Sequence, residues 1–278
     1  MSREKSEKEM SFLGHIVELR GHLVRSIIAI IAGAAIVGIF WDYILEQIIM
    51  APLKSDFYTF RIFNALAEWI GLGQLYPKEF DMSKELINLD PSGQITSQIS
   101  VVLVCGLIVA IPYVVWEIWR FIKPGLSENE QKYTNGTVLA ITFFFLAGII
   151  FSYYLLLPLS TQFLFTYNPF GVQNEWKLMS YITLFVQTLL GMGIVFLLPV
   201  FAYFLAKAGI LTPKFLKKYR KHAFVVILTI AAIITPNDFM SMIIAALPLW
   251  VLYEFSILIT QYVYKKEELK NQVDKIGD

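Results

Sequence analysis

The stretch from Ile99 to Trp119 reads ISVVLVCGLIVAIPYVVWEIW, an apolar run that suits the hydrocarbon core of a bilayer. A helix needs about 20 mostly apolar residues to cross about 30 Å of hydrocarbon. Five further apolar stretches occur at residues 23–41, 137–159, 181–206, 223–234 and 239–264. The stretch at 223–234 is short, but a turn at Pro236 and Asp238 leads from it into the last one. The sequence therefore predicts an all-α, polytopic membrane protein with six transmembrane helices.

The Lys and Arg residues gather on alternate connections between these stretches. Positive charges resist translocation, so the connections that hold most of them are expected to be cytoplasmic, together with both termini. We predict a single domain over residues 1–278. Its parts are a cytoplasmic amphipathic helix at 1–22, a long extracytoplasmic loop at 53–98, a cytoplasmic loop at 120–136 and a cytoplasmic tail at 265–278.

The composition supports a membrane protein, since 56% of the residues are hydrophobic and only 16% are charged. The first apolar run is of spanning length and lacks a small-residue cleavage site, so we expect it to be retained. A net charge of +1 gives no indication of nucleic-acid binding, and the single cysteine, Cys105, excludes an internal disulfide. We find no nucleotide-binding loop, nucleophile–base pair or cofactor motif, and therefore predict neither an enzyme nor a bound cofactor.

The residues before the first apolar stretch form a polar constellation. With Ser11 as the N-cap, a helix would bring His15, Glu18 and His22 to one face. Such a face could hold a metal ion, but a wetted helix surface explains it more simply. A carboxylate at the membrane surface could also receive an arginine, whose planar fork makes two charge-assisted hydrogen bonds.

Two ionisable residues interrupt the apolar stretches. Glu117 lies near the cytoplasmic end of the second stretch, where it pairs with Arg120 or has a function. Glu254 lies far from any Lys in the sequence, so its partner must come from another helix, from water or from a second protein. Glu128 and Glu130 follow Ser127 in the 120–136 loop, where helix capping is the simplest explanation.

Seven motifs follow one another along the chain. They are Phe12-x-x-His15-x-x-Glu18-Leu19-Arg20, Ala51-Pro52-Leu53, the stretch from Pro112 to Leu126 followed by Glu130, Tyr153 with Pro158, Phe196 with Pro199, Thr235-Pro236-Asn237-Asp238, and Leu247-Pro248 with Tyr253-Glu254. In these motifs and their order the chain resembles, over nearly its whole length, the TatC family, the signal-binding core of the twin-arginine protein translocase.

The resemblance implies six helices in a concave, glove-like monomer in the inner or plasma membrane. It also implies binding of twin-arginine signal peptides on folded cargo proteins and export driven by the proton motive force. The implied partners are small single-span subunits of the TatA and TatB type, membrane lipids and further copies of the chain, with no nucleic acid.

Site residues follow from the same resemblance, position by position. Glu18 and Glu130 would face the two arginines of the signal peptide. The resemblance places Arg20, Phe121 and Pro124 around that site, with Glu117 at a neighbouring polar position. The further intramembrane or assembly positions are Gln187, Gln162, Glu254, Tyr153, Asp238 and Pro52.

The chain departs from the family in two regions. A glutamate commonly follows the Phe at position 196, whereas this chain has Leu197, and we predict that Gln187 supplies the missing polar group, with Gln162 and Thr188 as alternatives. The loop at 53–98 is longer than expected. It holds an apolar pattern that could form an interfacial amphipathic helix, at Phe57, Phe60, Phe63, Leu66 and Ile70.

Three other functions stay open at this stage. A small-solute secondary transporter should have inverted repeats and midplane charges, and we find neither. An intramembrane metalloenzyme would use His15, Glu18 and His22. A structural scaffold would need Glu18 for assembly and not for peptide binding.

Overall fold

The computed structural model describes residues 2–77, 79–123, 134–171, 174–235 and 238–277. The chain divides into two compact units. Unit 1 comprises residues 1–44 and 98–143, and unit 2 comprises residues 45–97 and 144–278. We describe each unit by itself.

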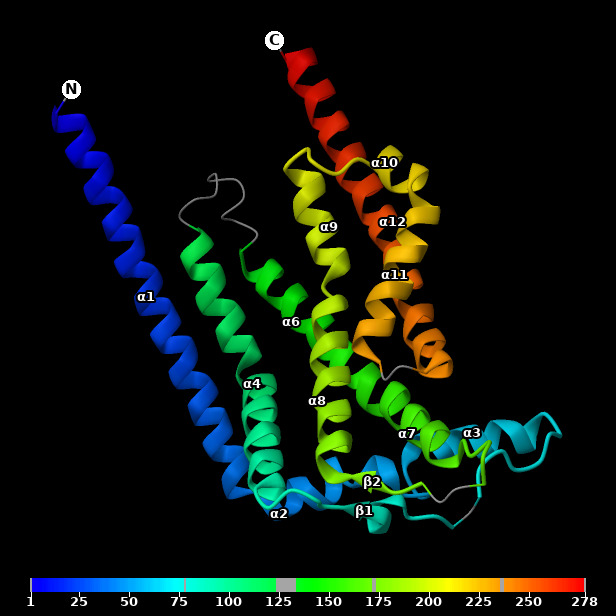
Figure 1. The fold of residues 1–278 in the computed structure, drawn as a ribbon. Coiled ribbons are helices and arrows are strands. Elements are labelled where there is room, and N and C mark those ends of the chain that lie inside the picture. Colours follow the sequence, from blue (N-terminus) through cyan, green and yellow to red (C-terminus); the bar gives the residue numbers. More distant parts are fainter. Residues whose placement is uncertain (1, 78, 124–133, 172–173, 236–237, 278) are drawn as a thin grey trace. The chain divides into compact units, whose positions relative to one another are not determined.

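Unit 1 is dominated by two long helices, α1 (Ser2–Ile39) and α4 (Gly93–Ile122), which lie side by side in Figure 1. Gly33 and Gly106 let the two backbones meet, because a Cβ added at Gly33 would lie 2.6 Å from the carbonyl oxygen of Gly106. Small residues at such a contact are typical of helix pairs in membranes. The first helix ends near a short turn, α2 (Trp41–Ile44).

Unit 2 begins with the connection between the first two long helices. Its elements are the π-helix η1 (Leu45–Ile49), the 3-10 helix η2 (Ala51–Leu53), α3 (Tyr58–Trp69), the 3-10 helix η3 (Met82–Glu85) and β1 (Leu86–Ile87). β1 pairs in parallel with β2 (Trp176–Lys177), so that Leu86 lies opposite Trp176. The long loop predicted at 53–98 is therefore a folded region with its own helix.

The remaining helices follow in chain order. They are α6 (Thr134–Phe151), the π-helix η5 (Ser152–Leu156), α7 (Leu157–Thr166), α8 (Leu178–Val195), α9 (Leu198–Lys207), α10 (Pro213–Lys218), α11 (Arg220–Ile234) and α12 (Phe239–Gly277). Within unit 2, α12 packs against α9, α10 and α11. The core that these helices share with α8 includes Met192, Ile227, Leu249 and Ile257.

Within the described residues, five helical segments are long and apolar enough to cross a membrane. They are Ile16–Ile39, Gly93–Ile122, Gly136–Thr166, Leu178–Lys207 and Phe239–Lys266. The predicted all-α, polytopic membrane fold is confirmed. The sixth predicted crossing lies in α11, whose 15 residues extend only about 22 Å at 1.5 Å per residue. A sixth crossing stays a prediction.

Two π-helices tie the membrane helices of unit 2 to the connection before α3. The i→i+5 pattern of a π-helix changes which carbonyls are paired within the helix. The hydroxyl of Tyr153, in η5, donates to the carbonyl of Ile48 in η1 at 3.1 Å. The fully buried Tyr181 donates in the same way to Ile49. These bonds fix the connection against α8 and η5.

Candidate functional site

A buried carboxylate joins the two long helices of unit 1. Glu117, on α4, has no exposed surface, and three donors surround it. Its Oε2 lies 2.5 Å from Nδ1 of His22 and accepts a 3.0 Å hydrogen bond from Nε of Arg25. The hydroxyl of Tyr113 donates to Oε1 at 3.0 Å. A buried charge needs such partners, because desolvation disfavours it otherwise.

Nδ1 of His22 can donate to Glu117 or accept from Arg25, so its role depends on which ring nitrogen carries the proton. Nδ1 of His22 lies 2.5 Å from Glu117 and 2.9 Å from Nη2 of Arg25. Arginine has only donors, so a lone pair on Nδ1 would face it favourably, whereas an ionised carboxylate has only acceptors. Arg25 already donates to Glu117 through Nε. We assign the proton to Nδ1 of His22, which then donates to Glu117 and makes the carboxylate the shared acceptor of the cluster.

The same helix pair sets the position of the predicted peptide-binding residues on α1. His22 lies opposite Glu117, and Gly33 lies opposite Gly106, so the antiparallel register brings Glu18 level with Phe121. The ring of Phe121 is 6.0 Å from that of His22.

Both predicted peptide-binding residues on α1, Glu18 and Arg20, are exposed. Pro124 and Glu130 lie outside the described residues, as does the side chain of His15. The structure therefore describes one of the two carboxylates predicted to bind arginines.

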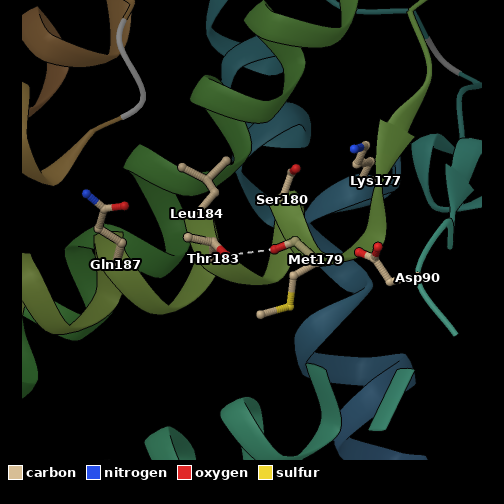
Figure 2. Close-up of a pocket in the computed structure, with 7 residues that line it drawn as sticks. All are labelled: Asp90, Lys177, Met179, Ser180, Thr183, Leu184 and Gln187. Carbon is tan, nitrogen blue, oxygen red and sulfur yellow. Dashed lines mark hydrogen bonds between the residues drawn. The ribbon is translucent and has the colours of Figure 1, made fainter. Parts of the chain in front are cut away.

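A second polar surface lies on α8, in unit 2. An open pocket of about 400 Å³ runs along this helix. Figure 2 shows Gln187 at one end of its lining and Asp90 and Lys177 at the other. Ser180 and Thr183 lie between them, one helical turn apart. The side-chain amide of Gln187 donates to the carbonyl of Ile233 near the end of α11.

The comparisons with known proteins decide the family. Residues 14–248 match the family model described as Sec-independent protein translocase protein (TatC). The chain belongs to the TatC family. A TatC from Blattabacterium sp. subsp. Periplaneta americana is 40% identical over 265 residues, which cover 95% of this chain and 100% of that protein. A TatC from Helicobacter pylori strain J99 is 38% identical over 207 residues, which cover 71% of this chain and 82% of that protein.

Solved structures of TatC agree with this assignment. A structure titled twin arginine translocase receptor TatC, in DDM, is 30% identical, with a TM-score of 0.68, and the match covers 88% of this chain and 99% of that one. A second structure of the receptor is 29% identical, with a TM-score of 0.65 and coverage of 90% and 99%. The chain is thus a multi-pass membrane component of the Sec-independent, twin-arginine protein translocase, and its role is in transport.

The three residues predicted to supply a polar group near Leu197 differ in their surroundings. Thr188 is buried, and its hydroxyl donates to the carbonyl of Leu184 in its own helix. Gln162 is 8% exposed, and no donor among the described residues contacts its Oε1. Gln187 is exposed and lines the pocket on α8. Gln187 is therefore the alternative that a ligand could reach.

The other predicted intramembrane or assembly positions have structural partners in unit 2. Glu254, on α12, accepts a 2.6 Å bond from Nη2 of Arg220 at the start of α11, which confirms a partner from another helix. Asp238 caps α12, since its Oδ1 accepts from the backbone amide of Ser241 at 2.7 Å. Pro52 is buried in η2, and Tyr153 binds η1 as described above.

The sequence analysis missed Tyr113 and Arg25 as members of the Glu117 cluster and did not connect His22 with Glu117. Tyr113 precedes Glu117 by four residues and Arg25 follows His22 by three, so each pair shares a helix face. That spacing was a usable signal, but the register between α1 and α4 was not visible in one sequence. Arg120, the local partner considered for Glu117, instead lies 5.4 Å over the ring of Trp116. In the part of the chain that the structure describes, no three His, Cys, Asp or Glu side chains could hold a metal ion.

Proposed function

We propose that this chain is the receptor of the twin-arginine translocase and binds the paired arginines of a signal peptide at the surface formed by Glu18. One observation carries the proposal. Glu18 is an exposed carboxylate held level with the end of α4, whereas Glu117 is buried and has three donors of its own. An incoming guanidinium can reach Glu18 and finds the acceptors of Glu117 occupied.

Two carboxylates suit a motif with two arginines. Each guanidinium can make paired, charge-assisted hydrogen bonds with one carboxylate, a geometry that lysine cannot reproduce. Glu18 supplies the first carboxylate and Glu130 the second. Arg20, Phe121 and Pro124 shape the surroundings, with the Phe121 ring held against His22.

Glu117 acts as a positioning residue in this proposal. It binds donors from α1 through His22 and Arg25 and a donor from α4 through Tyr113. Glu18 lies one helical turn before His22, so the rotation of α1 that suits Glu117 also sets the direction of Glu18. The cluster thereby keeps the receptor surface in place before the peptide arrives.

The wider arrangement follows from this role. We place both termini and the 120–136 loop in the cytoplasm, with six crossings and residues 53–98 on the opposite side. Small single-span subunits and further copies of the chain complete the translocase, and the proton motive force drives export. The chain contributes binding and no catalysis or cofactor. Gln187 offers its polar group to a partner or to the cargo from the pocket on α8, with Gln162, Tyr153, Asp238, Pro52 and Glu254 supporting assembly.

The test measures binding of a labelled twin-arginine signal peptide to the purified protein in nanodiscs. We expect Glu18→Ala to weaken binding at least about tenfold, since a charge-assisted bidentate contact contributes about 1.5–3 kcal/mol. The same peptide with both arginines replaced by lysine should bind the unmodified protein weakly and should not discriminate between it and Glu18→Ala.

Glu68→Ala is the matched control, because Glu68 is also an exposed helical carboxylate but lies on α3 in unit 2. It should bind the arginine peptide like the unmodified protein. Equal loss in Glu68→Ala and Glu18→Ala would show a general charge effect and contradict the proposed site. Full binding by Glu18→Ala would contradict it directly.

A further inference from the structure

The helix α3 has one side that packs on the protein. Phe60 is fully buried, and its ring meets those of Tyr76 and Phe80, each at 5.1 Å. Ala67 is 1% exposed, and the hydroxyl of Thr59 donates to the carbonyl of Tyr154 in η5. These contacts fix the rotation of α3, so its opposite side faces outward in a defined way.

That outward side is apolar. Tyr58, Ile62, Leu66 and Trp69 fall within about 80° of one another at 3.6 residues per turn, and all four are more than half exposed. Trp69 is 84% exposed. A contiguous apolar stripe of this kind, left uncovered on a folded region, marks a surface that meets a membrane or another protein.

Charged residues form a narrow border beside the stripe. Arg61 and Glu68 are exposed and lie about 20° apart on the helix, next to Tyr58. The helix thus has three sectors: one packed on the protein, one apolar and one charged. This division is typical of a helix lying in the plane of a membrane interface, with its charged edge in water.

The apolar stripe continues onto a membrane span. The ring of Tyr58 meets that of Tyr154 edge to face at 6.3 Å, and Tyr154 lies within the candidate span Gly136–Thr166. Tyr154 is 43% exposed, and Ile150, one turn earlier, is 58% exposed. The outward surface of the span therefore continues directly into α3. An open recess of about 460 Å³ lies at this junction, lined mostly by apolar and aromatic residues.

We propose that α3 is an interfacial anchor whose stripe of Tyr58, Ile62, Leu66 and Trp69 inserts into the lipid leaflet nearest residues 45–97. Lipid is the occupant because the stripe is continuous with the outward apolar surface of a candidate membrane span. Tyr and Trp are favoured at this depth, where an apolar ring and a polar group each find a suitable environment. The recess beside Tyr154 accommodates part of an acyl chain.

The proposal revises the face expected from the sequence. The pattern at Phe57, Phe60, Phe63, Leu66 and Ile70 correctly predicts a helix, because α3 spans Tyr58–Trp69. Its Phe57 and Phe60 nevertheless pack inside the protein. Tyr58, Ile62 and Trp69, which that pattern omits, form the outward stripe.

The experiment places single nitroxide labels on the full chain in vesicles of phosphatidylethanolamine and phosphatidylglycerol. Cys105, the one cysteine, is first replaced by alanine. Each label is then attached to a single introduced cysteine, at Ile62→Cys or Leu66→Cys on the stripe. A label at Glu68→Cys, on the charged edge of the same helix, is the matched control. The power saturation of each label is compared in oxygen, which concentrates in lipid, and in a water-soluble nickel chelate.

We expect the labels at 62 and 66 to be relaxed by oxygen more than by nickel, at a depth of about 5–10 Å below the headgroups, and the label at 68 to show the reverse. Equal nickel access at all three positions would overturn the proposal, because the stripe would lie in water. Protection of 62 and 66 from both reagents would also overturn it and favour a protein on this surface.

Discussion

Two carboxylates on apolar helices of this chain are neutralised by arginine in different ways. Glu117, on α4, is fully buried and binds Arg25, His22 and Tyr113. Glu254, on α12, is paired with Arg220 at 2.6 Å. Both side chains remain more than a third exposed, at 45% for Arg220 and 35% for Glu254. Of the two arginine–glutamate pairs, the shorter one, Arg220 with Glu254, is thus also the more exposed one.

The difference shows that distance alone does not rank these pairs. A buried ion that loses its partner keeps the full penalty of desolvation, which costs about 3–5 kcal/mol. An ion pair that water reaches contributes about 0–1 kcal/mol, because water screens it and two long side chains must be held in place. Arg220 begins α11 directly after the Lys-rich α10, so we expect water to reach its pair with Glu254. The Glu117 cluster should therefore determine how α1 and α4 pack, whereas the Glu254 pair should adjust the packing of α11 on α12 only slightly.

Arg25→Met is expected to lower the free energy of unfolding more than any other variant considered. It leaves the buried Glu117 with His22 and Tyr113 alone, and we expect the free energy of unfolding in detergent to fall by about 3 kcal/mol. The double variant Arg25→Met with Glu117→Met should recover part of this loss, because the buried charge is gone as well. A titration with SDS measures all three proteins. A double variant less stable than Arg25→Met would contradict the account, since removal of both charges would then cost more than removal of one.

A smaller effect is expected from Gln187→Leu, which tests a neutral hydrogen bond between helices. The variant removes the donor to the carbonyl of Ile233, and interhelical bonds of this kind contribute about 0.6 kcal/mol on average. We expect a modest loss of stability and reduced export of a twin-arginine cargo at equal protein level. Thr183→Val is the matched control, because its hydroxyl bonds to the carbonyl of Met179 within α8. Normal export by Gln187→Leu would exclude Gln187 as the functional polar group.

Breaking the exposed Arg220–Glu254 pair should also cost little stability and, unlike Gln187→Leu, should leave function unchanged. We expect Glu254→Gln to reduce the free energy of unfolding by less than about 1 kcal/mol, with signal-peptide binding unchanged. The difference from the unmodified protein should shrink as salt is raised, because screening already weakens the pair. Comparison of both proteins at low and high salt measures this. A loss as large as that of Arg25→Met would show that Glu254 is as dependent on its partner as Glu117, and the contrast between the two sites would fail.

The same contrast explains what the sequence could and could not predict. Length and apolarity predict the long membrane helices, because these properties are local and additive along the chain. Two of the three partners of Glu117, His22 and Arg25, are not local, since Arg25 lies 92 residues away and reaches Glu117 only through the register of α1 on α4. The sequence offered Arg120, one turn along the same helix, which lies over Trp116 instead.

The helix α3 shows the same limit from another side. Its apolar residues predict a helix, but they occupy more than one face, and periodicity cannot tell the face that packs on Tyr76 and Phe80 from the face that remains exposed. The short helix α11 is similar, because its 15 residues are apolar enough to predict a crossing but fewer than the roughly 20 that a spanning helix normally has.

The smallest expected effect involves Asp81, a carboxylate outside the membrane spans, in the folded region between α1 and α4. Hydrogen bonds from Ser83 lower the pKa of Asp81 below its ordinary value, with a smaller contribution from Lys84. A lowered native pKa stabilises the folded state at pH values above the unfolded pKa of about 3.9. This stabilisation is lost as the pH falls through the native pKa. Ser83→Ala should therefore reduce the protection of backbone amides around η3 from hydrogen exchange at neutral pH and make little difference well below pH 4. A Ser83→Ala effect that persisted unchanged at acidic pH would mean that the hydroxyl acts through packing and not through the charge of Asp81, in contrast to Glu117, where charge is the basis of the whole cluster.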